Sequence, residues 1–355
     1  MKILSSIILP LSLMITLLQF SCKSPIEPDN TLPGRRDYTW TQDTLKVSAE
    51  EGYLSIIKMW ASSPTDIWAV GWAYRNENCV WHYDGNGWKN VVVDRYISPF
   101  TVFGFAPNDV WIGGTDGAFW HYDGVKLSKN TEIQLEGFKL VSFAEIRGRN
   151  ANDIYAVGRA DSIDGFHSTG IIFHFDGGKW SKINTWIPNN NFFSIRFNPP
   201  SGNYIIISNE YYNQTVTAKV YRFDGKNLKQ LFKGDGNLGL DNIGENVYIT
   251  INGIIYKYEE DTLKIFKDFS HPGYLATVVY AGRIWGKSET DFFTGNQDWW
   301  IGHYNGSDLI NIYKPGYTNL SDAVVFPNDV FFIGIDVYSR SNIIVHGKLK
   351  PQFWR

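Results

Sequence analysis

Apolar and polar residues alternate along short stretches of this chain, and the stretches recur in a fixed order. Residues 66–71 (DIWAVG) and 109–114 (DVWIGG) alternate with a period of two, and aromatic runs ending in Asp-Gly follow, as in 118–124 (AFWHYDG). Alternation of this kind indicates β-strands whose two faces differ in burial. An Asp-Gly pair accepts the positive φ angles of a tight turn, so the pattern predicts antiparallel strands joined by short turns.

This unit occurs seven times, and each copy divides into four strands, here called a to d. The residue that opens strand b recurs at intervals of 38 to 50 residues, in the series Asp66, Asp109, Asp153, Asn203, Val247, Asp291 and Asp329. A period in the forties with β-type patterning is the sequence signature of propeller blades. We therefore predict an all-β fold, a seven-bladed β-propeller of four-stranded blades, over residues 37–355.

The last repeat ends after strand c, at 343–350 (IIVHGKLK). A segment that resembles a strand d stands at the other end of the chain, at 37–47 (DYTWTQDTLKV), where it places a Trp as the other d strands do. We expect this N-terminal strand to complete the last blade. Closing the ring in this way removes the exposed sheet edges that an open array would leave.

The repeat order ND-(V/I)-(W/Y)-x-x-G-G … H-(Y/F)-D-G-x-x-W is similar to that of kelch-type propellers, and the second copy carries both glycines, Gly113 and Gly114. It looks closer still to propeller lipoproteins of Bacteroidetes-type bacteria with DVWAVG…HYDG..W repeats. It differs from WD-repeat proteins, because no Gly-His…Trp-Asp pair recurs. Since propellers host many functions, the resemblance implies a fold and leaves the activity open.

The N-terminal segment has a separate character. Residues 1–21 have an early Lys and a long apolar run, which is typical of a secretory signal peptide, with an uncleaved signal anchor as the alternative. The run ends in LLQFSC, which resembles the lipobox of bacterial lipoproteins and implies that Cys22 is lipidated. By the family pattern, Lys23 favours the outer membrane over inner-membrane retention, facing either the periplasm or the outside. Residues 22–36 are expected to form a polar, Pro-containing tether.

Composition excludes some partners. The chain has 33 Lys and Arg against 36 Asp and Glu, so it carries no basic footprint for nucleic acid. If Cys22 carries lipid, Cys79 is the one thiol left and no intramolecular disulfide can form. We interpret Cys79 as a small apolar side chain within a strand.

The histidines are the most tempting metal ligands, but five of them occupy the same place in strand c: His82, His121, His174, His303 and His346. Equivalent positions in different blades are spread around a ring and cannot converge on one ion. We expect a repeated packing and hydrogen-bonding role instead. The recurring Asp of the Asp-Gly pairs suits turn capping. Nucleophile-elbow and phosphate-loop motifs are absent, so we predict no catalytic residue, metal or cofactor.

Variation between the repeats is concentrated on one side of the predicted ring. The a–b corners and c–d turns are monotonous, whereas the b–c loops, which lie with the d–a connections on the opposite side, are rich in aromatic, amide and charged residues. We call this second side the loop face. Its candidate ligand-binding residues are Tyr74, Arg75, Asp161, Asp164, His167, Trp186, Tyr211, Tyr212, Asn213, Trp299 and Arg340. Function tends to lie on such loops held by a rigid scaffold.

Aromatic rings beside amides and carboxylates suit carbohydrate, and the same composition suits a protein interface. We therefore predict a lipid-anchored, non-enzymatic binding module with a glycan or an envelope protein as ligand. One alternative is a glycan-active lyase or hydrolase, for which Asp161 and His167 are the available acid/base candidates. The other is a structural subunit of an envelope complex.

Overall fold

A computed structural model describes residues 33–45, 53–73, 78–93, 98–212, 214–270, 282–296 and 298–351. The described chain is all-β, with strands β1 to β28 and a short 3-10 turn at Thr115–Gly117. No helix in these ranges is long and apolar enough to cross a membrane. The predicted signal peptide and Cys22 lie outside the described residues, as do Tyr74, Arg75 and Asn213.

Consecutive strands pair antiparallel to form four-stranded sheets. The first sheet holds β2 (Leu54–Ser63), β3 (Asp66–Ala73), β4 (Val80–Tyr83) and β5 (Trp88–Asn90), and the second holds β6 (Pro99–Ala106), β7 (Asp109–Gly114), β8 (Ala118–Tyr122) and β9 (Leu127–Glu132). The third holds β10 (Phe138–Asn150), β11 (Asp153–Ser162), β12 (Ser168–Phe175) and β13 (Trp180–Pro188). The fourth holds β14 (Asn190–Asn198), β15 (Asn203–Tyr212), β16 (Thr215–Phe223) and β17 (Leu228–Gly234).

The next eight strands form one sheet with two antiparallel halves. The halves are β18 (Leu238–Ile243), β19 (Asn246–Ile251), β20 (Ile254–Glu259) and β21 (Thr262–Asp268), and β22 (Ile284–Ser288), β23 (Asp291–Gly295), β24 (Ile301–Tyr304) and β25 (Leu309–Tyr313). A single parallel pairing of Ile243 with Gly286 joins them. The remaining sheet combines β1 (Tyr38–Leu45) with β26 (Thr318–Val325), β27 (Asp329–Asp336) and β28 (Asn342–Leu349).

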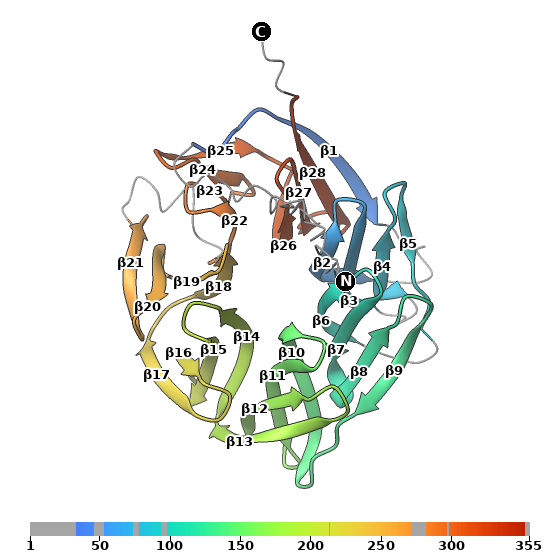
Figure 1. Ribbon diagram of the computed structural model, residues 1–355, viewed down its shortest axis with the longest axis vertical. Helices are drawn as coiled ribbons and strands as arrows, with labels where there is room; N and C mark the ends of the chain where they lie inside the picture. The colour runs from blue at the N-terminus through green and yellow to red at the C-terminus, as the bar shows by residue number, and fades with distance from the viewer. Residues whose placement is uncertain are drawn as a thin grey trace, which may run out of the picture.

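The sheets are arranged radially around a central opening (Figure 1). The first strand of each repeat, from β2 to β26, lies nearest the centre, and the fourth strand lies outermost. Strand b is the most deeply buried, as in β7, where Val110 to Gly114 are all buried. Apolar side chains of neighbouring sheets pack against one another in the wedges between them, and these wedges hold the core.

The N-terminal strand closes the ring as expected. β1 pairs antiparallel with β28 along its whole length, from Tyr38 with Leu349 to Leu45 with Asn342. The indole of Trp40 stacks on Tyr313, 4.7 Å away. Contacts begin ahead of β1, because the backbone N–H of Gly34 donates to the carbonyls of the neighbouring sheet. The chain is therefore already packed at residues that the sequence assigns to the tether.

The repeated histidines have the structural role that the sequence predicts. In the β6–β9 sheet, His121 of β8 donates from Nε2 to Asp109 at 2.7 Å, and its ring lies 4.4 Å from that of Trp111. The same Asp–His pair recurs as Asp66–His82, Asp153–His174, Asp291–His303 and Asp329–His346. Each pair ties the start of strand b to strand c. These histidines therefore fasten the repeats that carry them at the a–b corner.

The Asp-Gly turns also behave as predicted. Asp123 accepts backbone hydrogen bonds from Val125 and Lys126, both at 2.9 Å, and these bonds lower the pKa of its carboxyl. Gly124 has φ 91°, and an added Cβ there would lie 2.7 Å from Cβ of Asn108 in the a–b corner. The c–d turn and the a–b corner thus pack on each other, which makes this side of the ring structural.

Two local predictions are wrong. The corner of the fifth copy lies at Asn246 rather than Val247, because β19 begins at Asn246 and the register pairs Tyr248 with Lys257. Trp186 lies within β13 rather than in a connection, since that strand continues to Pro188. Asn246 pairs with Ile243 across the β18–β19 turn, and beyond an irregularity that contains Trp186 the β12–β13 ladder resumes at Ile187 and Pro188.

Candidate functional site

The wall of the central opening carries a buried charge network. Glu145 of β10 is fully buried and contacts three cations: Arg196 at 2.6 Å, Arg147 at 2.8 Å and Lys58 at 3.2 Å. It also accepts hydrogen bonds from the hydroxyl of Ser194 and from a backbone N–H of β14 at 2.8 Å. Strands of three different sheets are thereby joined at one carboxylate.

This network has the wrong chemistry for acid/base catalysis. Burial alone would raise the pKa of Glu145, but the charges of Arg147, Arg196 and Lys58 outweigh it and hold that pKa well below the ordinary 4.5. A general acid needs a pKa near the working pH, which a carboxylate surrounded by three cations does not have. Glu145 is therefore a structural ion at the centre of the ring.

Exposed aromatic side chains gather on the loop face. Among the described residues, the aromatic rings with large exposed areas are Trp72, Phe166, Tyr211, Tyr212, Tyr317 and Tyr338. All of them lie at the end of strand b, in a b–c loop or in a d–a connection. A folded chain that leaves this much aromatic surface on one side in water has a surface suited to a partner.

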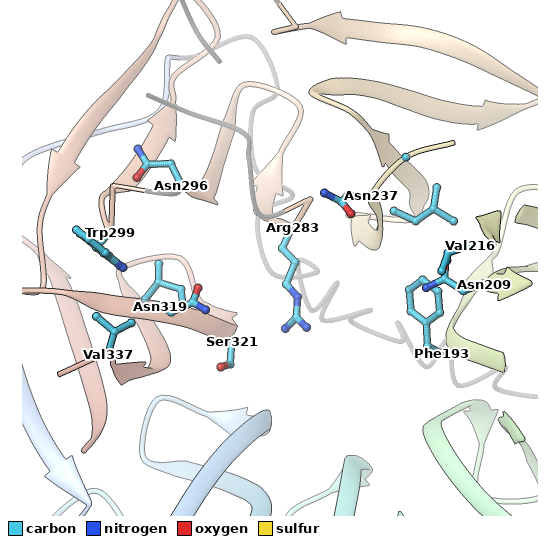
Figure 2. Close-up of a pocket in the computed structure, with 13 residues that line it drawn as sticks. Phe193, Asn209, Val216, Asn237, Arg283, Asn296, Trp299, Asn319, Ser321 and Val337 are labelled. Atoms are coloured by element: carbon cyan, nitrogen blue, oxygen red, sulfur yellow. The ribbon is translucent and has the colours of Figure 1, made fainter. Parts of the chain in front are cut away.

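A cavity of about 640 Å³ opens on the same face. Its lining comes from b–c loops and d–a connections between β14 and β27, together with residues within or just before the innermost strands. Figure 2 shows Trp299, Asn319 and Val337 on one side and Phe193, Asn209 and Val216 on the other. The cavity is therefore placed off-centre at the mouth of the central opening.

An aromatic row extends outward from the wall of the cavity that Trp299 lines. Trp299 has a positive φ of 62°, and Asn296 fixes this turn by accepting from the backbone N–H of Trp300 at 2.9 Å. The ring of Trp299 meets Tyr317 edge-on at 5.1 Å, and Tyr317 meets Tyr338 edge-on at 4.8 Å. Aromatic pairs prefer such edge-to-face contacts, so the row is a packed unit rather than three independent side chains.

A cation covers part of this aromatic row. Lys314 Nζ lies 5.7 Å from the ring centre of Trp299 and 5.8 Å from that of Tyr317. Cation–π contacts of this length place the ammonium group against the ring face. The faces of these two rings are thus occupied in part by Lys314.

The opposite wall is apolar with amide groups. Phe193 from β14 and Val216 from β16 line it beside Asn209. Tyr211 pairs with Val216 in the β15–β16 ladder, so Tyr211 and the following Tyr212 stand at the rim of this wall. Both rings are exposed and extend the apolar surface beyond the cavity.

The predicted site residues do not all lie at the cavity. Trp299 lines the cavity and Tyr211 and Tyr212 flank it, while Arg340 lies on the β27–β28 loop beside the aromatic row. Asp161 lies near the end of β11, Asp164 and His167 lie in the loop between β11 and β12, and none of the three lines the cavity.

The β11–β12 loop is held together by its own hydrogen bonds. Ser168 donates to Asp161 at 2.8 Å, and Asp164 accepts from the backbone N–H of Phe166 at 2.9 Å. Trp186 packs elsewhere, stacked on Phe138 with Lys182 over its ring.

Sequence reasoning missed several residues of the cavity. Arg283, Asn319 and Ser321 line it from positions at or near the start of innermost strands. Tyr317 and Tyr338 complete the aromatic row with Trp299, and neither was among the predicted ligand-binding residues. A signal was available for Tyr317, because the connection 314–317 (KPGY) contains an aromatic residue that the d–a connections should bring to the loop face.

The radial sheets, the closed ring and a site at the mouth of its opening together define a β-propeller. Three solved structures share this fold. YCF48 bound to D1 peptide has 14% identity, covers 91% of this chain and 99% of its own, and has a TM-score of 0.59. YCF48 from Cyanidioschyzon merolae has 14% identity, coverages of 86% and 98% and a TM-score of 0.57, and the WD40 β-propeller domain of Doa1 has 12% identity, coverages of 84% and 98% and a TM-score of 0.52. No protein-family model and no curated protein matches the sequence. At these identities the likeness shows the fold alone, and the resemblance to kelch repeats stays a prediction.

Proposed function

We propose that this protein is a lipid-anchored β-propeller that binds a peptide segment of a partner protein in the cavity of its loop face. The observation that carries the proposal is the coincidence of the about 640 Å³ cavity with the exposed aromatic side chains on one side of the ring. The concave site combines amide groups with apolar side chains such as Phe193 and Val216, so it can both hydrogen-bond and pack against a ligand. On the opposite side the corners and turns pack on one another, as Gly124 does on Asn108.

The ring of this proposal has seven blades. The five four-stranded sheets and the two halves of the eight-stranded sheet each hold one repeat in the order a to d. The halves are joined by one bridge, between Ile243 and Gly286, whereas the strands within each half pair over several residues. A contact of that size is what two neighbouring blades make where their innermost strands converge.

The chemistry of the cavity favours a peptide over a glycan. A sugar stacks on an open ring face, but Trp299 and Tyr317 are packed edge-on and partly covered by Lys314. The cavity is also lined by apolar side chains such as Phe193 and Val337, which suit the side chains of a peptide. The YCF48 propeller, which has the same fold, was solved with a D1 peptide bound.

The anchor of this proposal is the lipid on Cys22, in the outer membrane. Support comes from the sequence, where an apolar run leads to LLQFSC and a polar tether follows. An anchor of this kind would hold the propeller beside the membrane, where its loop face could meet envelope proteins.

Peptide binding can be tested with the full-length chain, purified in detergent so that its N-terminus is retained. The probe is an array of random octapeptides, with a glycan array alongside. Alanine replacement of Tyr211, Tyr212 and Trp299 together should weaken peptide binding at least about tenfold, because buried aromatic anchors dominate interfaces. The melting temperature should change by only a few degrees, since Tyr211 and Tyr212 are exposed and Trp299 is only partly buried.

A matched control replaces three exposed apolar residues away from the loop face with alanine, namely Val125, Ile265 and Ile310. This variant should bind like the wild type. Peptide binding that survives the loop-face replacements would refute the site. Capture of glycans without any peptide would refute the ligand class and return the carbohydrate alternative.

A further inference from the structure

The cavity contains one ionisable group among the side chains that line it, the guanidinium of Arg283 just before β22. We propose that Arg283 binds a carboxylate of the ligand and that the cavity therefore selects acidic peptides. This inference rests on the proposed function and specifies which chemistry the peptide brings.

Arg283 lacks the partners that other inward-facing arginines have. Arg147 and Arg196 both contact Glu145, at 2.8 Å and 2.6 Å. Arg283 forms no ion pair with any described residue, and its buried Nη1 has no hydrogen-bond acceptor. A buried charged donor left unpaired is unfavourable, so a ligand that supplies an acceptor regains this energy.

The register of the strands shows that Arg283 departs from the repeat. In their own sheets, Glu145 pairs with Val157 and Asp322 pairs with Ile333, at the same position of strand b. Ile284 pairs with Thr294, one position earlier in strand b, so Arg283 is the equivalent of Glu145 and Asp322. Glu145 and Asp322 each accept a backbone N–H of the next sheet, from Ile195 at 2.8 Å and Met59 at 3.0 Å respectively. An arginine can only donate, so Arg283 cannot make this contact. Its side chain is therefore free for another acceptor.

The surroundings of Arg283 favour a carboxylate. In Figure 2 its side chain extends into the middle of the cavity, with Ser321 and Asn319 on one side and Asn237 on the other. The side-chain amides of Asn237 and Asn319 make no hydrogen bond to the described residues, so both can donate to a ligand. No Asp or Glu lines the cavity to neutralise the charge.

The shape and charge of the Arg283 guanidinium fit a carboxylate. The planar guanidinium matches the two oxygens of a carboxylate, which it can bind through two parallel hydrogen bonds. A single positive charge balances a carboxylate, whereas a phosphate dianion would be left half neutralised. The carboxylate can come from a peptide C-terminus or from an Asp or Glu side chain, and both sources present the same pair of oxygens.

The test uses the full-length chain and random tetrapeptides coupled through their N-termini, in two matched sets with free and with amidated C-termini. Each set includes a version without Asp and Glu. We expect the wild type to prefer peptides with a carboxylate at least about tenfold, and Arg283→Gln to abolish this preference, because the charge-assisted hydrogen bonds are then lost. Arg283→Lys, which keeps the charge but loses the fork, should retain only part of it.

Lys126→Gln is the control, because it removes one positive charge from an exposed turn on the opposite side. It should bind like the wild type. A preference confined to free C-termini, or to Asp and Glu side chains, supports the inference and identifies the source. Peptides that bind equally with and without carboxylates, and equally to Arg283→Gln, would overturn the inference while leaving peptide binding intact. An array that captures no peptide at all would overturn the proposed function as well.

Discussion

Replacing Glu145 with glutamine should be one of the most destabilising single substitutions in the chain. The carboxylate is fully buried and contacts Lys58, Arg147 and Arg196 within 3.2 Å. Glutamine keeps the shape and some hydrogen bonds, including that to Ser194, but leaves three cations without a counter-charge. Removing one partner of a buried ion pair typically costs about 3–5 kcal/mol, and we expect a loss in that range.

The pH dependence gives this prediction a second, independent magnitude. The folded-state pKa of Glu145 is held well below the ordinary 4.5, so the folded protein resists a proton that the unfolded chain accepts. The stabilisation is therefore complete above about pH 4.5 and is lost as the pH falls through the folded-state pKa. The difference between the wild type and Glu145→Gln should shrink over this range.

Urea unfolding, followed by tryptophan fluorescence, measures both quantities. Glu245→Gln, at an exposed position, is the matched control and should change the free energy of unfolding by less than about 0.5 kcal/mol. Adding Arg147→Met to Glu145→Gln should recover part of the loss, because it removes one of the unpaired cations. A Glu145→Gln protein as stable as the control at pH 7, or a loss that stays constant down to pH 3, would refute the assigned role of this carboxylate.

Two further substitutions test the repeated elements. Gly124→Ala should cost about 1–3 kcal/mol, because φ is 91° and the new Cβ would lie 2.7 Å from Asn108, whereas Gly87→Ala, with no atom within 4 Å, should be tolerated; equal stability in a urea titration would contradict the turn geometry. Burial lowers the pKa of His303 despite its hydrogen bond to Asp291, so stability should decline as the pH falls below about 6.5. His303→Gln should lose this part of the pH dependence between pH 7.5 and 5, and an unchanged slope would contradict the prediction.

The repeat made most of the fold predictable from the sequence. The pattern of strand b, strand c and the Asp-Gly turn is local, so each strand could be located without knowledge of its neighbours. The closure by β1 followed from a missing fourth strand and from Trp40, which stacks on Tyr313 as a strand d residue should pack. The Asp–His pairs, such as Asp109 with His121, could be inferred as structural from their equivalent positions.

The cavity was harder to predict because it is made by departures from the pattern. Arg283 precedes an innermost strand, where apolar and polar residues alternate loosely and nothing in the sequence marks one position as central. The burial of Glu145 depends on cations from three sheets, which only the closed ring brings together. Asp161 and His167 looked equally suitable in the sequence, yet neither the end of β11 nor the loop that follows it lines the cavity.

The repeats that depart most from the sequence pattern lie in the same part of the ring as the cavity. In two of them a longer cation replaces the histidine of strand c, and this replacement explains how the sheets are held together there. Lys257 stands where other copies have the histidine, and it reaches Glu289 of the next sheet half at 2.8 Å. Arg222 holds the same position in β16 and contacts Asp261 beyond its own sheet at 3.5 Å. A histidine fastens strands within one sheet, whereas these longer cations link one sheet to the next. The sheets that line the cavity are therefore bound to each other from outside the opening, which leaves Arg283 and its neighbours free to face a ligand.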